Sequence, residues 1–148
     1  MKAPLGNGAL GLRPPHDGAS VLASIFSEIN VNSMDKALVS ILVPIFNVEK
    51  YLDRCLSSLR DQSYRNIEVL CINDGSTDGS RTIIDSYTSS DSRFKLIDKP
   101  NSGYGDSMNK GLEAAQGKYI SILESDDFLD SDAIEHMVGE AESDQLEV

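Results

Sequence analysis

Three acidic residues, Glu124, Asp126 and Asp127, lie within four positions directly after the mostly apolar residues 119–123. Carboxylates this close repel one another, so either a cation neutralises them or water separates them. Mg²⁺ and Mn²⁺ prefer carboxylate oxygens and commonly share them with the phosphate groups of a substrate. The sequence therefore favours a divalent metal ion here over the alternative, a solvated acidic loop.

A second candidate segment, residues 73–80, reads AsnAspGlySerThrAspGlySer. Gly75 can adopt a positive φ angle, and the short polar side chains can cap a following helix. The segment is therefore either a dense capping turn or a ligand-binding loop that presents Asp74. It lacks the Gly-X-Gly-X-X-Gly pattern of dinucleotide-binding folds and the GlyLysSer or GlyLysThr of a phosphate-binding loop.

A third segment, residues 44–49, reads ProIlePheAsnValGlu and follows an apolar run. Pro44 has no N–H and a restricted φ angle, which suits a pocket wall where a strand leaves a sheet. Asn47 and Glu49 add polar groups at the same place. The alternative is an ordinary turn in which Glu49 lies near a helix N-terminus, where the helix dipole favours an anion.

The elements that must position these segments alternate in type. Four apolar stretches of strand length, residues 38–46, 67–72, 94–97 and 119–123, are separated by stretches with helical periodicity. The pattern predicts an α/β fold with an open, mostly parallel sheet, in which ligands bind beyond the carboxyl ends of the strands. The helix after residue 103 is predicted to bury one face, which consists of Tyr104, Met108, Leu112 and Ala115.

Charge is distributed unevenly along the 148 residues, which carry 24 acidic and 13 basic side chains and a net charge of −11. Such an acidic chain is not expected to bind nucleic acid, which requires a basic surface. Residues 1–37 are rich in Gly and Pro and carry a net charge of zero. They are predicted to form a loosely ordered extension. Residues 38–148 form the predicted domain, and residues 124–148 contain ten acids and no Lys or Arg.

Cys55 and Cys71 lie among apolar neighbours and are predicted to be buried, reduced thiols, since two cysteines do not make a disulfide framework. No run reaches the roughly 20 apolar residues that a membrane span needs. Pro4 and nearby glycines interrupt any signal-peptide apolar region. These features predict a cytoplasmic location.

The order and spacing of four motifs resemble the family 2 glycosyltransferases of the GT-A fold. The motifs are ValSerIleLeuValProIlePheAsnValGlu, AsnAspGlySerThrAspGlySer, AsnLysGlyLeuGluAlaAlaGlnGlyLysTyrIle and GluSerAspAsp, and the resemblance covers residues 38–138. It implies an inverting transfer of a sugar from a nucleotide-sugar donor, most often UDP-linked, to an acceptor hydroxyl, with Mg²⁺ or Mn²⁺ as cofactor.

The resemblance also implies individual roles. Pro44 and Phe46 match positions that flank the nucleobase, Glu49 matches a position that lines the nucleotide pocket, and Asp74 matches the carboxylate that contacts the base. Asp126 and Asp127 match the Asp-X-Asp-like motif near the ribose and the metal ion. Glu124 stands where the family most often has Asp, so it keeps the carboxylate but changes its reach. Residues 101–106 and Asn109 match a segment near the donor phosphates.

The general base of the family lies in the acceptor-binding half, after the Asp-X-Asp strand. The resemblance therefore implies that the fold is incomplete at the C-terminal end, that the base lies beyond Val148, and that this chain alone is inactive or weakly active. The acceptor, whether a glycan, a lipid-linked molecule or another hydroxyl compound, stays open, as does membrane association of the parent protein.

Two other functions remain as alternatives. One is a non-catalytic nucleotide-binding or interaction module with the same fold. The other is a phosphotransfer domain, which is disfavoured because Lys118 precedes the fourth strand at its amino end, away from the acids.

Overall fold

The computed structural model describes residues 36–143, so the extension predicted for residues 1–37 lies almost entirely outside the described residues. Strands and helices alternate as the sequence predicts. Their bounds are β1 Val39–Ile45, α2 Glu49–Arg60, β2 Ile67–Asp74, α3 Ser80–Ser90, β3 Phe94–Lys99, α4 Tyr104–Ala114, β4 Tyr119–Ile122 and α5 Ala133–Ser143.

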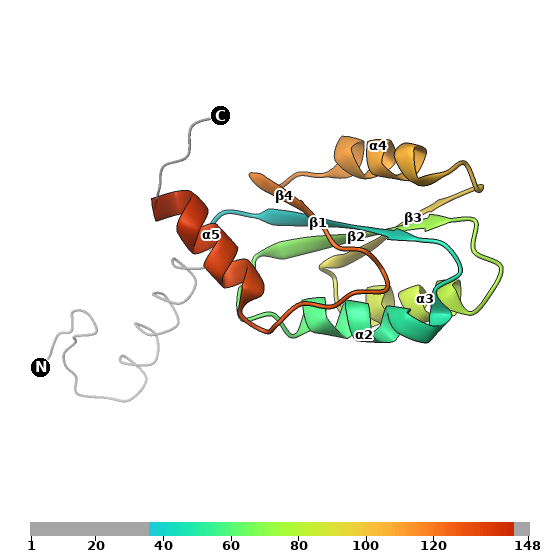
Figure 1. The fold of residues 1–148 in the computed structure, drawn as a ribbon, viewed down its shortest axis with the longest axis horizontal. Helices are drawn as coiled ribbons and strands as arrows, with labels where there is room; N and C mark the ends of the chain where they lie inside the picture. The colour runs from blue at the N-terminus through green and yellow to red at the C-terminus, as the bar shows by residue number, and fades with distance from the viewer. Residues whose placement is uncertain (1–35, 144–148) are drawn as a thin grey trace, which may run out of the picture. The chain divides into compact units, whose positions relative to one another are not determined.

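The four strands form one parallel sheet in the order β3-β2-β1-β4. Helices α2 and α3 lie on one face of this sheet and α4 lies on the other (Figure 1). Every residue of β1 and β2 is buried, as expected for central strands covered on both faces. The predicted open α/β sheet is confirmed.

Two apolar cores result, one on each face of the sheet. The larger core joins the sheet to α2, α3 and α5, and the smaller joins it to α4. Cys55 and Cys71 are both free and buried, as predicted, and burial raises the pKa of Cys55 to about 12. Within residues 36–143, no helix is both long enough and apolar enough to cross a membrane.

The predicted buried face of α4 is partly wrong: Met108 and Ala115 are partly buried against the smaller core, but the other two residues are not. Tyr104 and Leu112 are 53% and 51% exposed, whereas Ser107 and Gly111 are buried. A Cβ atom at Gly111 would lie 2.7 Å from Leu42 Cδ2, so the glycine allows α4 to approach β1 closely. Small residues make this contact, and hydrophobic periodicity does not detect them. Tyr51, one of the apolar residues at helical spacing in α2, is likewise 50% exposed.

A buried carboxylate connects three elements on the α4 face of the sheet. Glu68 Oε1 accepts hydrogen bonds from Ser40 Oγ at 2.6 Å and from the Gln116 backbone N–H at 2.7 Å, and Lys95 Nζ donates to Oε2 at 2.9 Å. Burial raises the pKa of Glu68, but these three donors outweigh burial and hold the pKa below its ordinary value. The carboxylate thus fixes where the chain turns from α4 into β4.

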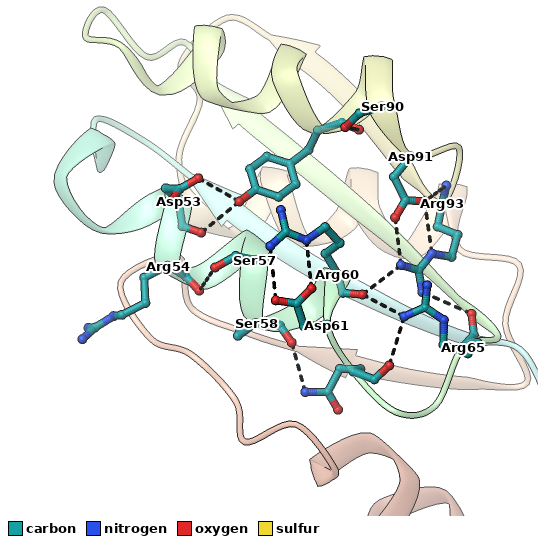
Figure 2. Close-up of polar contacts among 12 residues, drawn as sticks. Asp53, Arg54, Ser57, Ser58, Arg60, Asp61, Arg65, Ser90, Asp91 and Arg93 are labelled. Atoms are coloured by element: carbon teal, nitrogen blue, oxygen red, sulfur yellow. Dashed lines mark hydrogen bonds and ion pairs between the residues drawn. The ribbon is translucent and has the colours of Figure 1, made fainter.

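Arginine side chains close the C-terminal end of α2, at the edge of the sheet where the strands begin. Arg65 and Arg93 both donate to the carbonyl oxygen of Arg60, at 3.0 and 3.1 Å, and Arg93 also pairs with Asp91 (Figure 2). Carbonyl groups at a helix C-terminus lack partners within the helix and attract cations. The cluster therefore has a structural explanation.

We expect Glu68→Gln to destabilise the protein by about 2 kcal/mol, because the amide keeps the shape but cannot pair with Lys95 and accept from two other donors. Chemical denaturation at pH 7 measures this, with the exposed Glu113→Gln of α4 as the control. The folded pKa of Glu68 lies below its ordinary value of 4.5, so the carboxylate stabilises above that pH and its contribution is lost as the pH falls. The difference between wild type and Glu68→Gln should therefore shrink in acid; a constant difference would contradict this explanation.

Candidate functional site

A cavity of about 410 Å³ lies at the edge of the sheet where the strands end. The segments after β1, β3 and β4 contribute to its lining, together with Asp74 at the end of β2 and two residues of α4. The chain leaves β1 toward α2 on one face of the sheet and leaves β3 toward α4 on the other face, and residues of both connections line the cavity. Five residues selected from the sequence line this cavity together, namely Pro44, Phe46, Asp74, Glu124 and Asp126, whereas Asp127 is not among its lining residues.

The carboxylate of Asp74 is held from several sides. Its Oδ1 accepts hydrogen bonds from Lys99 Nζ at 2.5 Å and from the Ser102 N–H at 2.8 Å, and its Oδ2 accepts one from the Gly103 N–H at 3.1 Å. Burial raises the pKa of Asp74, and the donors more than compensate, so the pKa lies below its usual value. Asp74 is therefore an ionised, rigidly oriented acceptor at the wall of the cavity.

Lys99 is a functional residue that the sequence interpretation missed. It is the last residue of β3, directly opposite Asp74 in the β2–β3 register, and its side chain is only 7% exposed. Its ammonium group also pairs with Asp106 of α4 at 3.2 Å. A lysine at the end of a strand could have indicated this ion pair, but only after the strand register was known.

The loops after β1 and β2 are joined by their own polar groups. Asn47, which has a φ angle of 52°, accepts at Oδ1 from the backbone N–H groups of Thr77 and Asp78. Asp78 in turn accepts from the Glu49 N–H, and Glu49 Oε1 accepts from the Gly79 N–H at 3.2 Å. The structure thus places Glu49 in the contact between the two loops and not among the residues that line the cavity.

The acidic loop after β4 is fastened to α2. Gln62 is fully buried, and its side chain donates to the carbonyl oxygen of Asp130 and accepts from the Ile134 N–H. Ser58 Oγ accepts from the Leu129 N–H at 3.1 Å. These contacts hold the chain that follows Asp127, so the position of the acidic residues depends on α2.

Within the acidic loop, the three carboxylates differ. Glu124 lines the cavity and accepts a hydrogen bond from the hydroxyl group of Tyr104 at 2.8 Å, which raises the pKa of Tyr104. Asp126 and Asp127 are exposed, and among residues 36–143 no cation or hydrogen-bond donor contacts their carboxylates. These two carboxylates are therefore available to an external partner, whereas Glu124 already has one.

The donor set fits a divalent cation that a ligand helps to hold. Among the described residues, no three His, Cys, Asp or Glu side chains gather into a ready-made metal site. Mg²⁺ in nucleotide sites is typically bound by one or two carboxylates together with substrate phosphates and water. Asp126 and Asp127 supply that number of carboxylates, so a metal ion that binds together with a diphosphate is compatible with this loop.

The apolar wall of the cavity comes from the loop after β1. Pro44 is buried within β1, while Phe46 is 48% exposed at the cavity edge. An exposed aromatic ring beside a hydrogen-bonding carboxylate is a suitable surface for a flat, polar-edged group such as a nucleobase.

Sequence comparison decides the family. The profile described as Glycosyl transferase family 2 matches residues 40–148, which is most of the chain. The chain belongs to glycosyl transferase family 2. EpsJ of Bacillus subtilis (strain 168), described as an uncharacterized glycosyltransferase, is 38% identical over 111 residues, which are 75% of this chain and 32% of EpsJ. A chondroitin synthase of Escherichia coli is 37% identical over 107 residues, 72% of this chain and 16% of that protein.

Solved structures agree with the family assignment. TarS of S. aureus, crystallised in complex with UDP, superposes with a TM-score of 0.67 at 27% identity, over 71% of this chain and 32% of that chain. TarS was also solved with UDP-GlcNAc. The fold of this family 2 chain is thus the GT-A fold, as the resemblance implies. The chain spans about a third of the length of EpsJ and of the TarS 1–349 chain, and a fifth of the longer TarS chain.

We expect Lys99→Met to lower the thermal midpoint by several degrees, because it leaves the buried carboxylate of Asp74 without its cation. Lys50→Met, at an exposed position of α2, is the control and should change the midpoint by less than about one degree. In the wild type the pKa of Asp74 lies below its ordinary value of 3.8, so its stabilisation is complete above that pH and is lost below it. Equal midpoints for the two variants at pH 7 would contradict the role given to Lys99.

Proposed function

We propose that this chain is the donor-binding part of an inverting glycosyltransferase, which transfers a sugar from a nucleotide sugar, most simply a UDP-sugar, to an acceptor hydroxyl. The observation that supports it most is the cavity, which brings the oriented carboxylate of Asp74 and the unpaired carboxylate of Asp126 to the same opening. The complexes of TarS with UDP and UDP-GlcNAc support a uridine nucleotide as the ligand of this cavity.

In this proposal each residue acts through a group already described. Pro44 and Phe46 pack against the faces of the nucleobase, and Asp74 accepts an N–H from its edge. Asp74 Oδ2 has one bond to the Gly103 N–H, so it retains room for a second donor. Asp126 accepts from ribose hydroxyls, and Glu49 contributes indirectly, because it joins the two loops that carry Phe46 and Asp74.

Asp126 and Asp127 would hold Mg²⁺ or Mn²⁺. When bound, the ion offsets the negative charge that develops on the diphosphate as the sugar departs. Within the described residues, no cation pairs with the carboxylates of Asp126 and Asp127, so both are free to bind the ion. The third acidic side chain, Glu124, accepts a hydrogen bond from Tyr104 instead. The acidic loop is held by Gln62, in the segment that follows α2, and this contact keeps the ligands at a defined distance from the base-binding wall.

An inverting transfer also requires a general base that takes the proton of the acceptor hydroxyl. We infer that this base and the acceptor site are contributed by a part of the parent protein outside these 148 residues, because the relatives that match are longer than this chain. The acceptor is proposed to be a glycan or another hydroxyl compound, and the reaction is placed in the cytoplasm. The chain alone is then expected to bind donor without efficient transfer.

Isothermal titration of the chain with UDP, with and without Mn²⁺, tests the proposal. We expect Mn²⁺ to increase the affinity for UDP by about tenfold or more, because the diphosphate and two carboxylates share the ion. Mg²⁺ serves as a second metal, and a titration of Mn²⁺ alone reports binding without nucleotide. If UDP does not bind, or binds identically with EDTA, the proposed donor site is wrong.

Two substitutions in the acidic loop separate the roles of its carboxylates. Asp127→Asn should abolish the effect of Mn²⁺ on UDP affinity, because it removes a charged ligand that has no other partner. Glu124→Gln should retain most of that effect, because Glu124 already accepts from Tyr104 and an amide oxygen can still do so. The same titrations measure both variants, and equal behaviour of the two would show that the acidic loop has been misinterpreted.

A further inference from the structure

The hydroxyl group of Ser107 is an anomaly within the described residues. It is the one buried side-chain polar atom among residues 36–143 that has no hydrogen-bond partner, and Ser107 is only 1% exposed. Buried hydroxyl groups are nearly always paired, because an unpaired one loses its bonds to water without replacement. Ser107 also lines the cavity, so the missing partner is to be sought there.

Other helical serines of this chain show what Ser107 does not do. Ser57, Ser58, Ser86 and Ser90 each donate to a backbone carbonyl oxygen three or four residues earlier in their own helix. This local bond is the usual way for a serine in a helix to satisfy its hydroxyl group. Ser107 lies in the same kind of helix but makes no such bond, so its hydroxyl remains available to another group.

The position of Ser107 relates it directly to Asp74. The Ser107 N–H donates to the carbonyl oxygen of Gly103 at 3.1 Å, and the N–H of the same Gly103 donates to Asp74 Oδ2 at 3.1 Å. One turn further along α4, Gly111 lies against Leu42 and Ile72 of the sheet. Ser107 is therefore held between the strand ends and the cavity, one helical turn from the backbone that orients Asp74.

We propose that Ser107 is a further nucleotide-binding residue, whose hydroxyl donates to a carbonyl oxygen on the edge of the base next to the N–H that Asp74 accepts. The assignment rests on the proposed function. Asp74 is ionised and can only accept, whereas a hydroxyl can donate. On a uracil ring each carbonyl oxygen flanks the ring N–H, so an acceptor and a donor side by side match that edge. The proposal requires that, in the complex, the Ser107 hydroxyl takes a staggered position about the Cα–Cβ bond that points toward the base.

If Ser107 binds the base, removal of its hydroxyl group should affect the stability of the protein and its affinity for UDP differently. Ser107→Ala removes a hydroxyl that has no partner in the free protein, so the thermal midpoint should stay the same or rise. The affinity for UDP should nevertheless fall by about three- to tenfold, as expected for one hydrogen bond. Ser86→Ala in α3, whose hydroxyl has its own helical partner, is the matched control and should leave UDP affinity unchanged.

Titration of wild type, Ser107→Ala and Ser86→Ala with UDP, 2-thio-UDP and 4-thio-UDP in the presence of Mn²⁺ identifies the contact. Sulfur replaces one base carbonyl oxygen in each analogue and is a poorer acceptor. For the wild type, we expect one of the two analogues to bind more weakly than UDP. For Ser107→Ala, we expect that analogue and UDP to bind with equal affinity. This result would show that Ser107 and that carbonyl group are partners.

The remaining outcomes overturn the assignment in distinguishable ways. If wild type does not bind UDP, the proposed function fails and the assignment falls with it. If wild type binds UDP but Ser107→Ala binds it equally well, the role of Ser107 is wrong and the proposed function stands. If Ser107→Ala lowers the thermal midpoint and weakens all three nucleotides by the same factor, Ser107 is only structural.

Discussion

The buried carboxylate of Asp74 is the constraint on which the rest of this site depends. A charge removed from water must be compensated by several donors, and here a lysine and two backbone amides supply them. The lysine lies at the end of β3, and the amides belong to the two residues that precede α4. A single side chain of β2 therefore holds both segments in place. The backbone of Gly103, with a φ angle of 98°, takes the conformation that this bonding requires.

The other loops are positioned by similar means but from different elements. The loop after β1 is attached to the loop after β2 through Asn47, and the loop after β4 is attached to α2 through Ser58 and to the segment after α2 through Gln62. A pattern emerges in how polar groups are used. Asn47, Asp74, Asp78 and Gln62 have partners inside the chain and serve to position, whereas the carboxylates of Asp126 and Asp127 and the hydroxyl group of Ser107 lack partners among residues 36–143; Asp126 and Ser107 line the cavity. Most of the positioning groups are thus separate from the groups that are free to bind a ligand, and Asp74 belongs to both sets because its oriented carboxylate also lines the cavity.

Parts of this arrangement follow from the sequence, because their signals are local. The apolar, β-branched run of β1 predicts a buried parallel strand. The apolar residues of α2 fall at helical spacing, and all of them except Tyr51 are buried, namely Leu52, Cys55, Leu56 and Leu59. The predicted face of α4 was partly wrong because Ser107 and Gly111, which are small, form the closest contact with the sheet. Lys99 was missed because its significance depends on the residue opposite it on β2, 25 positions earlier in the chain.

By itself, the sequence determined the order of strands and helices, the family, and the convergence of three polar loops at one edge of a sheet. Those conclusions rest on periodicity and on motifs that are contiguous in the chain. Only the tertiary structure decided which polar groups are already bonded and which are free, since each bond joins residues from different elements. Glu49 and Glu124 proved to be bonded inside the chain, and Ser107 proved to be unpaired. A hydrogen bond depends on distances of a few tenths of an ångström, which only the packing of the elements sets.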